Sequence, residues 1–329
     1  MANKVTYLDH HASAPLLPVA RDAMMEMLDI VGNPSSVHGN GRKLRAAIET
    51  ARDKIALAVG TARGRVVFTG SATEALTQTI VGGVAAQGVD HVLYGAGEHM
   101  AVIRAVEATG IATSPIPMNV NGAYDLDALA KLIADQSAND KRLMVVVQQV
   151  NNETGVVQPI SDIERLIFET KHVLVLDAVQ GFGKVPFFFD PSRVDMMAIS
   201  AHKIGGPVGV GALILKPSMD SAKLIPGGGQ EQGRRGGTES AALIAGFGVA
   251  AEAAKKNFDV LAERKLLQHA EAELKNIWDE IEVFGRGAER TGTALCFAIP
   301  GLKNNISMIN YDLENVALSA GSACSSGKV

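Results

Sequence analysis

Residues 173–206, VLVLDAVQGFGKVPFFFDPSRVDMMAISAHKIGG, contain two apolar runs, and each is followed at once by side chains that can do chemistry. The first run, 172–176, ends at Asp177, and the second, 194–199, ends at Ser200-Ala-His-Lys203. Short apolar runs of this length are typical of strands buried on both faces. The segment therefore predicts two buried strands with functional residues at their carboxyl ends.

A lysine and a carboxylate at two such strand ends suit a site for pyridoxal phosphate (PLP). The amine of Lys203 can form a Schiff base with the cofactor aldehyde. The carboxylate of Asp177 can keep the pyridine nitrogen protonated, so that the ring acts as an electron sink. A solvated strand end with a surface lysine is the alternative, and the spacing alone favours neither interpretation.

Helix-like and strand-like patterns alternate on both sides of this segment, from residue 15 to about 215. Strands are expected at 65–69, 91–94, 112–117, 143–148, 172–176, 194–200 and 211–215, and helices at 42–59, 74–86, 100–109, 126–134 and 161–170. Since parallel strands need crossover helices, this rhythm predicts an α/β fold with a mainly parallel sheet. Ligands of such sheets bind beyond the carboxyl ends of the strands, where Asp177 and Lys203 are expected.

The pattern changes after the glycine-rich segment 226–237. A long helical run covers 238–282 with a break near 256–260, and 293–299 then alternates like a strand of a smaller sheet. Cys296 lies inside that expected strand and is expected to be an inert, buried thiol. We therefore expect a large domain at 15–253 and a small domain made of 1–14 and 254–329, against which the extended N-terminal segment packs.

Composition excludes several classes of protein. The 329 residues are 47% hydrophobic and 20% charged, with a formal net charge of −4, as in ordinary globular proteins. The sequence has no stripe of basic residues that would indicate a nucleic-acid surface. No segment has the length and apolarity of a signal peptide or a membrane span. Two cysteines give neither a disulfide framework nor the paired spacing of a zinc site, so a reducing cytoplasm is the expected compartment.

Two further segments follow the expected strands and could contact a bound cofactor. The turn 70–74, GSATE, could cradle a phosphate with its free backbone N–H groups and the hydroxyl of Thr73, or could simply cap a helix. In 150–155, VNNETG, the amides could bind a cofactor oxygen or a substrate carboxylate, or could form an ordinary turn.

Three more features have a functional and a structural interpretation. His99 could stack on a planar cofactor and move protons, or could be a capping residue. The segment 226–238, with six glycines and two adjacent arginines, could bind an anion or could be a flexible loop. Cys324 lies among small residues, where its thiol could swing, although a buried structural cysteine is the simpler interpretation.

Taken together, these segments resemble the PLP-dependent cysteine desulfurases of the class V aminotransferase group. The resemblance rests on eleven motifs in order along the chain: Tyr7-Leu-Asp9, Gly32-Asn-Pro-Ser-Ser-Val-His38, Gly41-Arg42, Gly70-Ser-Ala-Thr-Glu74, Glu98-His99, Asn151-Asn-Glu-Thr-Gly155, Asp177-Ala-Val-Gln180, Ser200-Ala-His-Lys203, Gly228-Gly-Gln-Glu231, Arg235-Gly-Gly-Thr238 and Gly321-Ser-Ala-Cys-Ser-Ser326. It implies a fold type I PLP-dependent transferase with a seven-stranded sheet in the large domain.

The resemblance also implies roles for individual residues. Lys203 would carry the cofactor and move the α-proton, Asp177 would pair with the pyridinium nitrogen, and Gln180 with the ring hydroxyl. His99 would stack on the ring and take part in catalysis. The remaining cofactor contacts would come from Ala72, Thr73, Asn152, Ser200 and His202, with Thr238 reaching the phosphate from the other subunit of a homodimer. Asn152 would also lie near the substrate carboxylate.

Cys324 would complete the implied reaction. It would take the sulfur of L-cysteine as a persulfide, leave L-alanine, and hand the sulfur to an iron–sulfur scaffold or a thiolation acceptor. The resemblance implies no metal site of the chain's own, although Cys324 could contact an iron–sulfur cluster in a complex with a partner. A selenocysteine lyase or a transaminase of the same class is the alternative activity.

The chain departs from the family pattern in two places. His11-Ala-Ser-Ala14 stands where the family often has Ala-Thr-Thr. Val329 follows Cys324 by five residues, whereas family members continue for several dozen and supply from that tail an arginine for the substrate carboxylate. A truncated PLP-fold protein with little activity is therefore a further expectation to be weighed.

Overall fold

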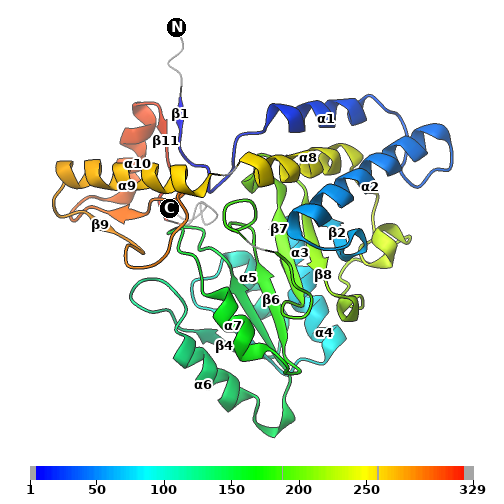
Figure 1. Ribbon diagram of the computed structural model, residues 1–329, viewed down its shortest axis with the longest axis horizontal. Helices are drawn as coiled ribbons and strands as arrows, with labels where there is room; N and C mark the ends of the chain where they lie inside the picture. The colour runs from blue at the N-terminus through cyan, green and yellow to red at the C-terminus, as the bar shows by residue number, and fades with distance from the viewer. Residues whose placement is uncertain (1–4, 187, 258, 322–329) are drawn as a thin grey trace.

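A seven-stranded sheet forms the centre of the computed structural model, which describes residues 5–186, 188–257 and 259–321 (Figure 1). The strand order is β2-β8-β7-β6-β5-β3-β4. The strands are β2 (Val66–Thr69), β3 (His91–Gly95), β4 (Ala112–Ile116), β5 (Leu143–Gln148), β6 (Val173–Asp177), β7 (Met196–Ser200) and β8 (Gly211–Leu215). Only β8 runs against its neighbours, so the predicted α/β fold with a mainly parallel sheet is confirmed.

Helices cover both faces of this sheet and bury alternate residues of its central strands. One layer contains α2 (Gly39–Val59), α6 (Leu126–Gln136), α7 (Ile160–Ile167) and α8 (Ala241–Asn257), and α1 (Pro18–Leu28) packs against α8. The other contains α3 (Ala72–Thr77), α4 (Gly83–Gln87) and α5 (Met100–Ala108). Along β7, Met197 and Ile199 face the first layer, while Met196 and Ala198 face the second. Burial on both faces explains why these strands are continuous apolar runs rather than alternating ones.

The predicted helices are present, with two differences in extent. Where one helix was expected at 74–86, α3 begins at Ala72 and is joined to α4 by a wider, π-helical turn, Gln78–Gly82. The helix expected at 161–170 ends at Ile167, and Glu169 then takes a left-handed backbone conformation with φ of 60°. The long run after residue 238 is confirmed as two helices, α8 and α9 (Val260–Ile277).

The register of the central strands sets the positions of the polar side chains. Asp177 at the end of β6 lies opposite Gln148 of β5 on one side and Ala198 of β7 on the other. Ser200 ends β7 opposite Gly211 of β8. A Cβ on Gly211 would lie 2.7 Å from the backbone carbon of Ser71. Glycine at this position therefore lets the start of α3 approach the same edge of the sheet.

The segment expected as a strand at 293–299 forms only two residues of strand. β10 (Phe297–Ala298) pairs with β9 (Glu282–Val283) in a two-stranded sheet, and Cys296 precedes it. All seven residues of 293–299 line a cavity, so the alternation in this sequence does not mark a strand with one buried face. The longer strand was therefore a wrong prediction.

The N-terminal segment packs against the C-terminal part of the chain, as expected. β1 (Thr6–Tyr7) runs parallel to β11 (Val316–Ala317), which follows α10 (Asn304–Leu313). In Figure 1 these elements lie beside α9 and apart from the large sheet. The division into domains at residues 14 and 253 stays a prediction.

The glycine-rich segment 226–237 is held to the sheet by a buried ion pair. Arg52 of α2 donates to both carboxylate oxygens of Glu231, at 2.6 and 2.8 Å, and each side chain is 3% exposed or less. The backbone N–H of Phe68 donates to the same carboxylate, and the Arg52 guanidinium lies 4.8 Å from the centre of the Phe68 ring. This bidentate contact fixes Glu231 against α2 and β2.

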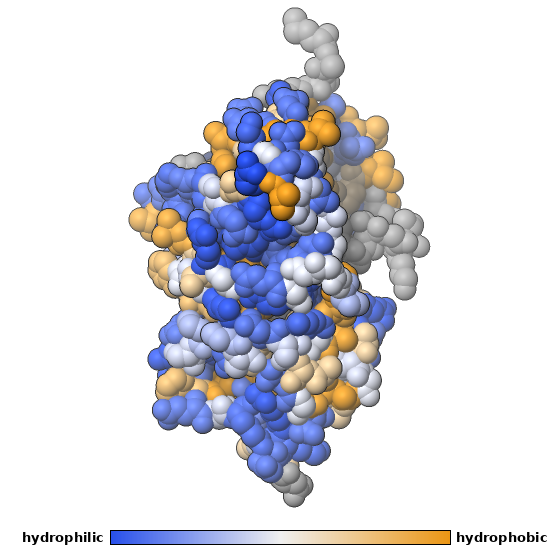
Figure 2. Space-filling model, turned by 90° about the vertical axis from the view of Figure 1, so that its right-hand side faces the viewer, coloured by the Kyte–Doolittle hydropathy of each residue, from blue (hydrophilic) through white to orange (hydrophobic). Residues whose placement is uncertain are grey.

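No helix in the described part of the chain is both long and apolar enough to cross a membrane. On the face of the molecule at the right of Figure 1, hydrophobic residues occur in small groups separated by hydrophilic ones (Figure 2). This mixture is the usual composition of a protein surface in contact with water.

We expect Glu231→Gln to lower the free energy of unfolding by about 2–4 kcal/mol, because Arg52 would keep a buried charge without its carboxylate. Urea unfolding at neutral pH measures the loss. Asp53→Asn is the matched control, since it removes the carboxylate of an exposed pair with Arg63. Equal losses in the two variants would show that the buried pair does not stabilise the fold.

Candidate active site

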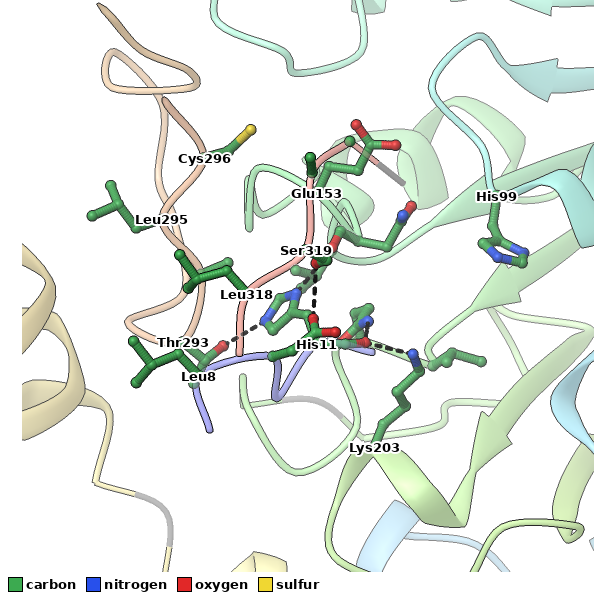
Figure 3. A pocket seen from close by; sticks show the side chains of 18 of the residues that line it. Leu8, His11, His99, Glu153, Lys203, Thr293, Leu295, Cys296, Leu318 and Ser319 are labelled. Atoms are coloured by element: carbon green, nitrogen blue, oxygen red, sulfur yellow. Dashed lines mark hydrogen bonds between the residues drawn. The ribbon is translucent and has the colours of Figure 1, made fainter. Parts of the chain in front are cut away.

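A cavity of about 340 Å³ lies at the carboxyl edge of the parallel strands. Its walls come from three parts of the chain: the ends of the central strands, the N-terminal residues 8–11, and the segment 293–321. Figure 3 shows Lys203 and His99 on the side of the sheet, with Leu295 and Cys296 across the cavity on the 293–299 loop. The volume is in the range of small-molecule sites.

Lys203 enters the cavity from the short turn that follows β7. Residues Ala201–Lys203 form one turn of 3₁₀ helix, and the lysine is 6% exposed. Its Nζ donates to the backbone carbonyls of His11, at 2.5 Å, and Ala12, at 3.0 Å. The lysine is therefore a buried amine held by the N-terminal segment rather than a surface side chain.

Asp177 lines the same cavity from the end of β6 and is also 6% exposed. Its Oδ1 accepts a hydrogen bond from the backbone N–H of Val179, at 2.9 Å. Burial raises the pKa of this carboxyl to about 6, although that N–H and the charge of Lys203 both act to lower it. The carboxylate would gain from a further cationic partner inside the cavity.

Gln180 follows Asp177 in the turn after β6 and lines the cavity with its amide. The Nε2 donates to the backbone carbonyl of His11 at 2.8 Å, and Oε1 accepts from Nζ of Lys184 at 2.6 Å. The structure thus brings Asp177, Gln180 and Lys203 together, as their positions in the sequence predicted.

His99 caps α5 and also lines the cavity, so both interpretations of this residue apply. Its Nδ1 accepts from the backbone N–H of Ala101 at 3.0 Å. A neutral imidazole that accepts at Nδ1 carries its hydrogen on Nε2, and this buried Nε2 has no hydrogen-bond partner among the described residues. Burial lowers the pKa of His99, and Lys203 lowers it further, so the ring is neutral.

Glu98, beside His99, is a buried acid that the sequence analysis quoted without giving it a role. Its Oε1 accepts from the Tyr124 hydroxyl at 2.5 Å and from the Gln148 N–H at 2.6 Å. Burial raises the pKa of Glu98 well above its ordinary value, and the nearby carboxyl of Asp177 raises it further. Glu98 therefore holds the end of β5 to the loop after β3.

The start of α3 combines a helix cap with a wall of the cavity. The Ser71 hydroxyl accepts from the Glu74 N–H at 3.1 Å, and the Glu74 carboxylate accepts from the Gly70 N–H at 2.7 Å. Ala72 and Thr73 lie in the first helical turn and line the cavity. Because N–H groups of a first turn have no partner within the helix, they are available to an anion.

Ser200 and His202 lie close together at the end of β7. The Ser200 hydroxyl is 2.9 Å from Nδ1 of His202, and His202 lines the cavity. Burial lowers the pKa of His202 to about 4, with smaller effects from Lys203 and Lys184. Its neutral ring can donate one hydrogen bond toward an acceptor.

In the loop after β5, two neighbouring asparagines have different positions. Oδ1 of Asn151 accepts from the N–H groups of Glu153 and Thr154, at 3.0 and 2.9 Å, which is the turn chemistry of the structural interpretation. Asn152 lines the cavity. The turn therefore fixes the backbone while Asn152 faces the site.

His11 is a site residue that the sequence analysis did not identify. Its Nδ1 lies 3.0 Å from the Asn152 carbonyl, and its Nε2 lies 2.9 Å from the Thr293 hydroxyl. A carbonyl can only accept, so Nδ1 carries the hydrogen. Burial lowers the pKa of His11 to about 3, with a smaller effect from Lys184. The sequence signal that could have identified His11 was the departure from the family pattern at residues 11–14.

The remaining predicted residues lie away from the centre of the cavity. Thr238 is exposed and does not line it. Arg235 pairs with Glu74 at 2.7 Å, and Arg234 donates to the carbonyl of Gly64, so these two arginines already have partners within the chain. Cys324 lies outside the described residues.

Cys296 is half-buried and faces the cavity from the side opposite Lys203 (Figure 3). Burial raises the pKa of its thiol, and the charge of Glu153 raises it further. The prediction of a buried Cys296 was therefore wrong, because the residue forms part of the cavity wall. A thiol with a raised pKa is a poor nucleophile at neutral pH, and its inertness stays a prediction.

The residues around the cavity fit PLP. The buried Asp177 carboxyl suits a protonated ring nitrogen, because a buried carboxylate is stabilised by a cation. The first turn of α3, with the neutral His202 nearby, suits a phosphate. Lys203 and His99 supply an amine for the aldehyde and a flat neutral ring for stacking. Among the described residues, no cluster of three or more histidine, cysteine or acidic side chains could hold a metal ion.

Comparison with known proteins gives consistent matches over almost the whole chain. The sequence model of the class-V aminotransferase family matches residues 6–328. The chain is 34% identical to the cysteine desulfurase IscS of Dictyoglomus turgidum over 331 residues, covering 98% of this chain and 83% of that protein.

Two solved structures are similar to this one. One is the NifS-like protein from Rickettsia africae, with a TM-score of 0.89 and 30% identity over 97% of this chain and 88% of that one. The other is SspA in complex with cysteine, with a TM-score of 0.82 and 28% identity over 97% of this chain and 90% of that one.

We expect the low pKa of His11 to make stability depend on pH. In the unfolded chain the imidazole takes up a proton below about pH 6.5, whereas the folded protein keeps it neutral down to about pH 3. The stabilisation is therefore complete above pH 6.5 and is lost as the pH falls toward 3. When the pH is lowered from about 7.5 to about 4.5, the free energy of unfolding should fall by about 1–2 kcal/mol less in His11→Gln than in the unchanged protein.

Urea unfolding at both pH values measures this difference. His269→Gln, on the exposed side of α9, is the matched control. Identical losses in His11→Gln and the unchanged protein would contradict the prediction.

Proposed function

This chain belongs to the class-V aminotransferase family, and from that premise we propose that it is a cysteine desulfurase, which converts L-cysteine to L-alanine and transfers the sulfur. The family is PLP-dependent, and the fold is that of the fold type I enzymes. The observation that carries the proposal is the meeting of Lys203 and Asp177 in one cavity, at the ends of two adjacent parallel strands.

When bound, PLP supplies an electron sink that weakens bonds at the carbon atoms of an amino-acid substrate. We propose that Lys203 holds the cofactor and then moves the proton at the substrate Cα. Its present acceptors, two backbone carbonyls of the N-terminal segment, would keep the ammonium oriented while it carries that proton. Asp177 would hold the ring nitrogen protonated, and its burial would keep water away from that pair.

The other proposed contacts follow the walls of the cavity. His99 would stack on the ring, and Gln180 and Asn152 would contact the ring hydroxyl. Ala72, Thr73, Ser200 and His202 would bind the phosphate. Asn152 would also lie near the substrate carboxylate. These assignments are supported by the family relationship and by the cavity that all but Ser200 line.

We propose that Cys324 accepts the sulfur. A bond would form between its Sγ and the substrate sulfur as the carbon–sulfur bond breaks, leaving a persulfide on the enzyme. Support comes from the residues just before it: 318–321 line the cavity, and the Ser319 hydroxyl donates to Asp9 at 2.8 Å. This contact joins residue 319, five residues before Cys324, to Asp9 in the wall of the cavity.

We further propose that the protein is a cytoplasmic homodimer and that it passes its sulfur to an iron–sulfur scaffold or a thiolation acceptor. The family relationship supports this, as does the exposed position of Thr238, which would reach the phosphate of the second subunit. A selenocysteine lyase or a transaminase is the alternative that the assays below distinguish.

We expect the PLP-loaded protein to release sulfide and alanine in equal amounts from L-cysteine in the presence of a thiol reductant. Cys324→Ala should abolish sulfide release. Cys296→Ala is the matched control, because it removes the other thiol of the chain and should leave turnover unchanged. Alanine formation that continues in Cys324→Ala, or turnover of selenocysteine alone, would point to the alternative activities.

We expect Lys203→Ala to lose the visible absorbance of the lysine-bound cofactor and all turnover, because no other lysine lines the cavity among the described residues. Absorbance after removal of unbound PLP measures this. Lys275→Ala, at an exposed position of α9, should keep the absorbance. If Lys203→Ala kept it as well, the central assignment of the site would be wrong.

A further inference from the structure

We propose that Lys184 is a positioning residue, which holds the Gln180 amide in the orientation that the cofactor site needs and, through the His11 carbonyl, steadies Lys203. The inference rests on the proposed function, because it concerns how the cofactor site is held in shape. Lys184 is not among the residues that line the cavity.

Lys184 is a buried lysine in the turn after β6. It is 8% exposed, and its backbone N–H donates to the Gly181 carbonyl at 2.9 Å. That turn places its side chain beside the one four residues earlier, and Nζ donates to Oε1 of Gln180 at 2.6 Å. The side chain therefore points back from the turn toward the site rather than out to water.

The contact fixes which end of the Gln180 amide faces the site. The ammonium form of Lys184 can donate hydrogen bonds but cannot accept them. The amide group that faces it is therefore the acceptor, the oxygen Oε1. Nε2 must then lie on the other side, where it donates to the His11 carbonyl at 2.8 Å. An amide nitrogen has two hydrogens, so one remains for an acceptor in the cavity that Gln180 lines.

The same carbonyl of His11 also accepts from Lys203 at 2.5 Å. A chain of three hydrogen bonds thus leads from Lys184 through Gln180 and His11 to Lys203. Without Lys184 the amide could turn over, and its oxygen would then face a carbonyl that can only accept. The His11 carbonyl would lose one of its two donors, and Lys203 would be held less firmly.

The electrostatic surroundings of Lys184 argue against a purely stabilising role. Lys203, His11 and His202 are the titratable groups that interact with it. Burial lowers the pKa of Lys184 to about 7, and the positive charge of Lys203 lowers it further. A buried amine whose strongest charged neighbour is another amine destabilises the fold. We infer that Lys184 is buried here because it orients the Gln180 amide.

A double-mutant cycle on PLP affinity tests whether Lys184 acts through Gln180. Lys184→Met and Gln180→Leu should each weaken PLP binding about tenfold, the effect of one hydrogen bond to a charged group. The double variant should bind no more weakly than Gln180→Leu alone, since the two residues act as one unit. Losses that multiply, or no loss in Lys184→Met, would overturn the proposal.

The pH titration of the bound cofactor's absorbance gives a readout that a merely structural lysine would not move. Removing a positive charge beside Lys203 favours the protonated form of the group that Lys203 makes with PLP. The midpoint should therefore rise in Lys184→Met by about half a pH unit. Lys255→Met, which removes an exposed lysine that donates to the Leu57 carbonyl, is the matched control and should not shift it.

Two further measurements keep the outcomes separate. If Lys184→Met folds too poorly to load, Lys184→Gln is measured instead: its amide can still donate to Gln180, so it should bind PLP as tightly as the unchanged protein, and a tenfold weaker binding would overturn the proposal. If the unchanged protein shows no Lys203-dependent absorbance at all, the proposed function fails. An unchanged protein that loads normally, with Lys184 variants that load and titrate identically to it, refutes only the role of Lys184.

Discussion

The pairing of β6 with β5 and β7 is the constraint on which the rest of the site depends. Because these strands are parallel and in register, Gln148, Asp177 and the residues after Ala198 reach the same edge of the sheet. Residues 21 or more apart in the sequence therefore become neighbours. One consequence is that Asp177 and Lys203 are buried together, where the charge of Lys203 acts to lower the pKa of Asp177.

Charge in this site is balanced by hydrogen bonds to the backbone more than by ion pairs within the chain. Lys203 donates to two carbonyls, and Asp177 accepts from a backbone N–H. The surrounding histidines, His11, His99 and His202, all have lowered pKa values and are neutral. The charged side chains that line the cavity are therefore Lys203 and the acids Asp9, Glu153 and Asp177.

Much of this arrangement could be predicted from the sequence, and the reasons for the failures are physical. Six of the seven strands were recognisable because buried strands of a parallel sheet are continuous apolar runs, and Asp177 ends one of them while Lys203 follows the next. The edge strand β4 is mostly exposed. The 293–299 segment was mistaken for a strand because its sequence alternates as a half-buried strand does, although all seven residues line the cavity. His11 contacts Asn152 and Thr293, which are far away in the sequence, and Lys184 reaches Lys203 only through Gln180 and the His11 carbonyl, so spacing along the chain predicts neither role.

The contacts that anchor the glycine-rich segment 226–237 also affect how a second protein surface would bind to it. Glu231 and Gln232 hold left-handed backbone conformations, with φ of 49° and 59°, which non-glycine residues adopt only when their contacts enforce them. The pair with Arg52 enforces the first of these. A segment that is already ordered loses little chain entropy on association. Encounter with a second subunit at this loop would then be limited by diffusion and orientation rather than by folding of the loop.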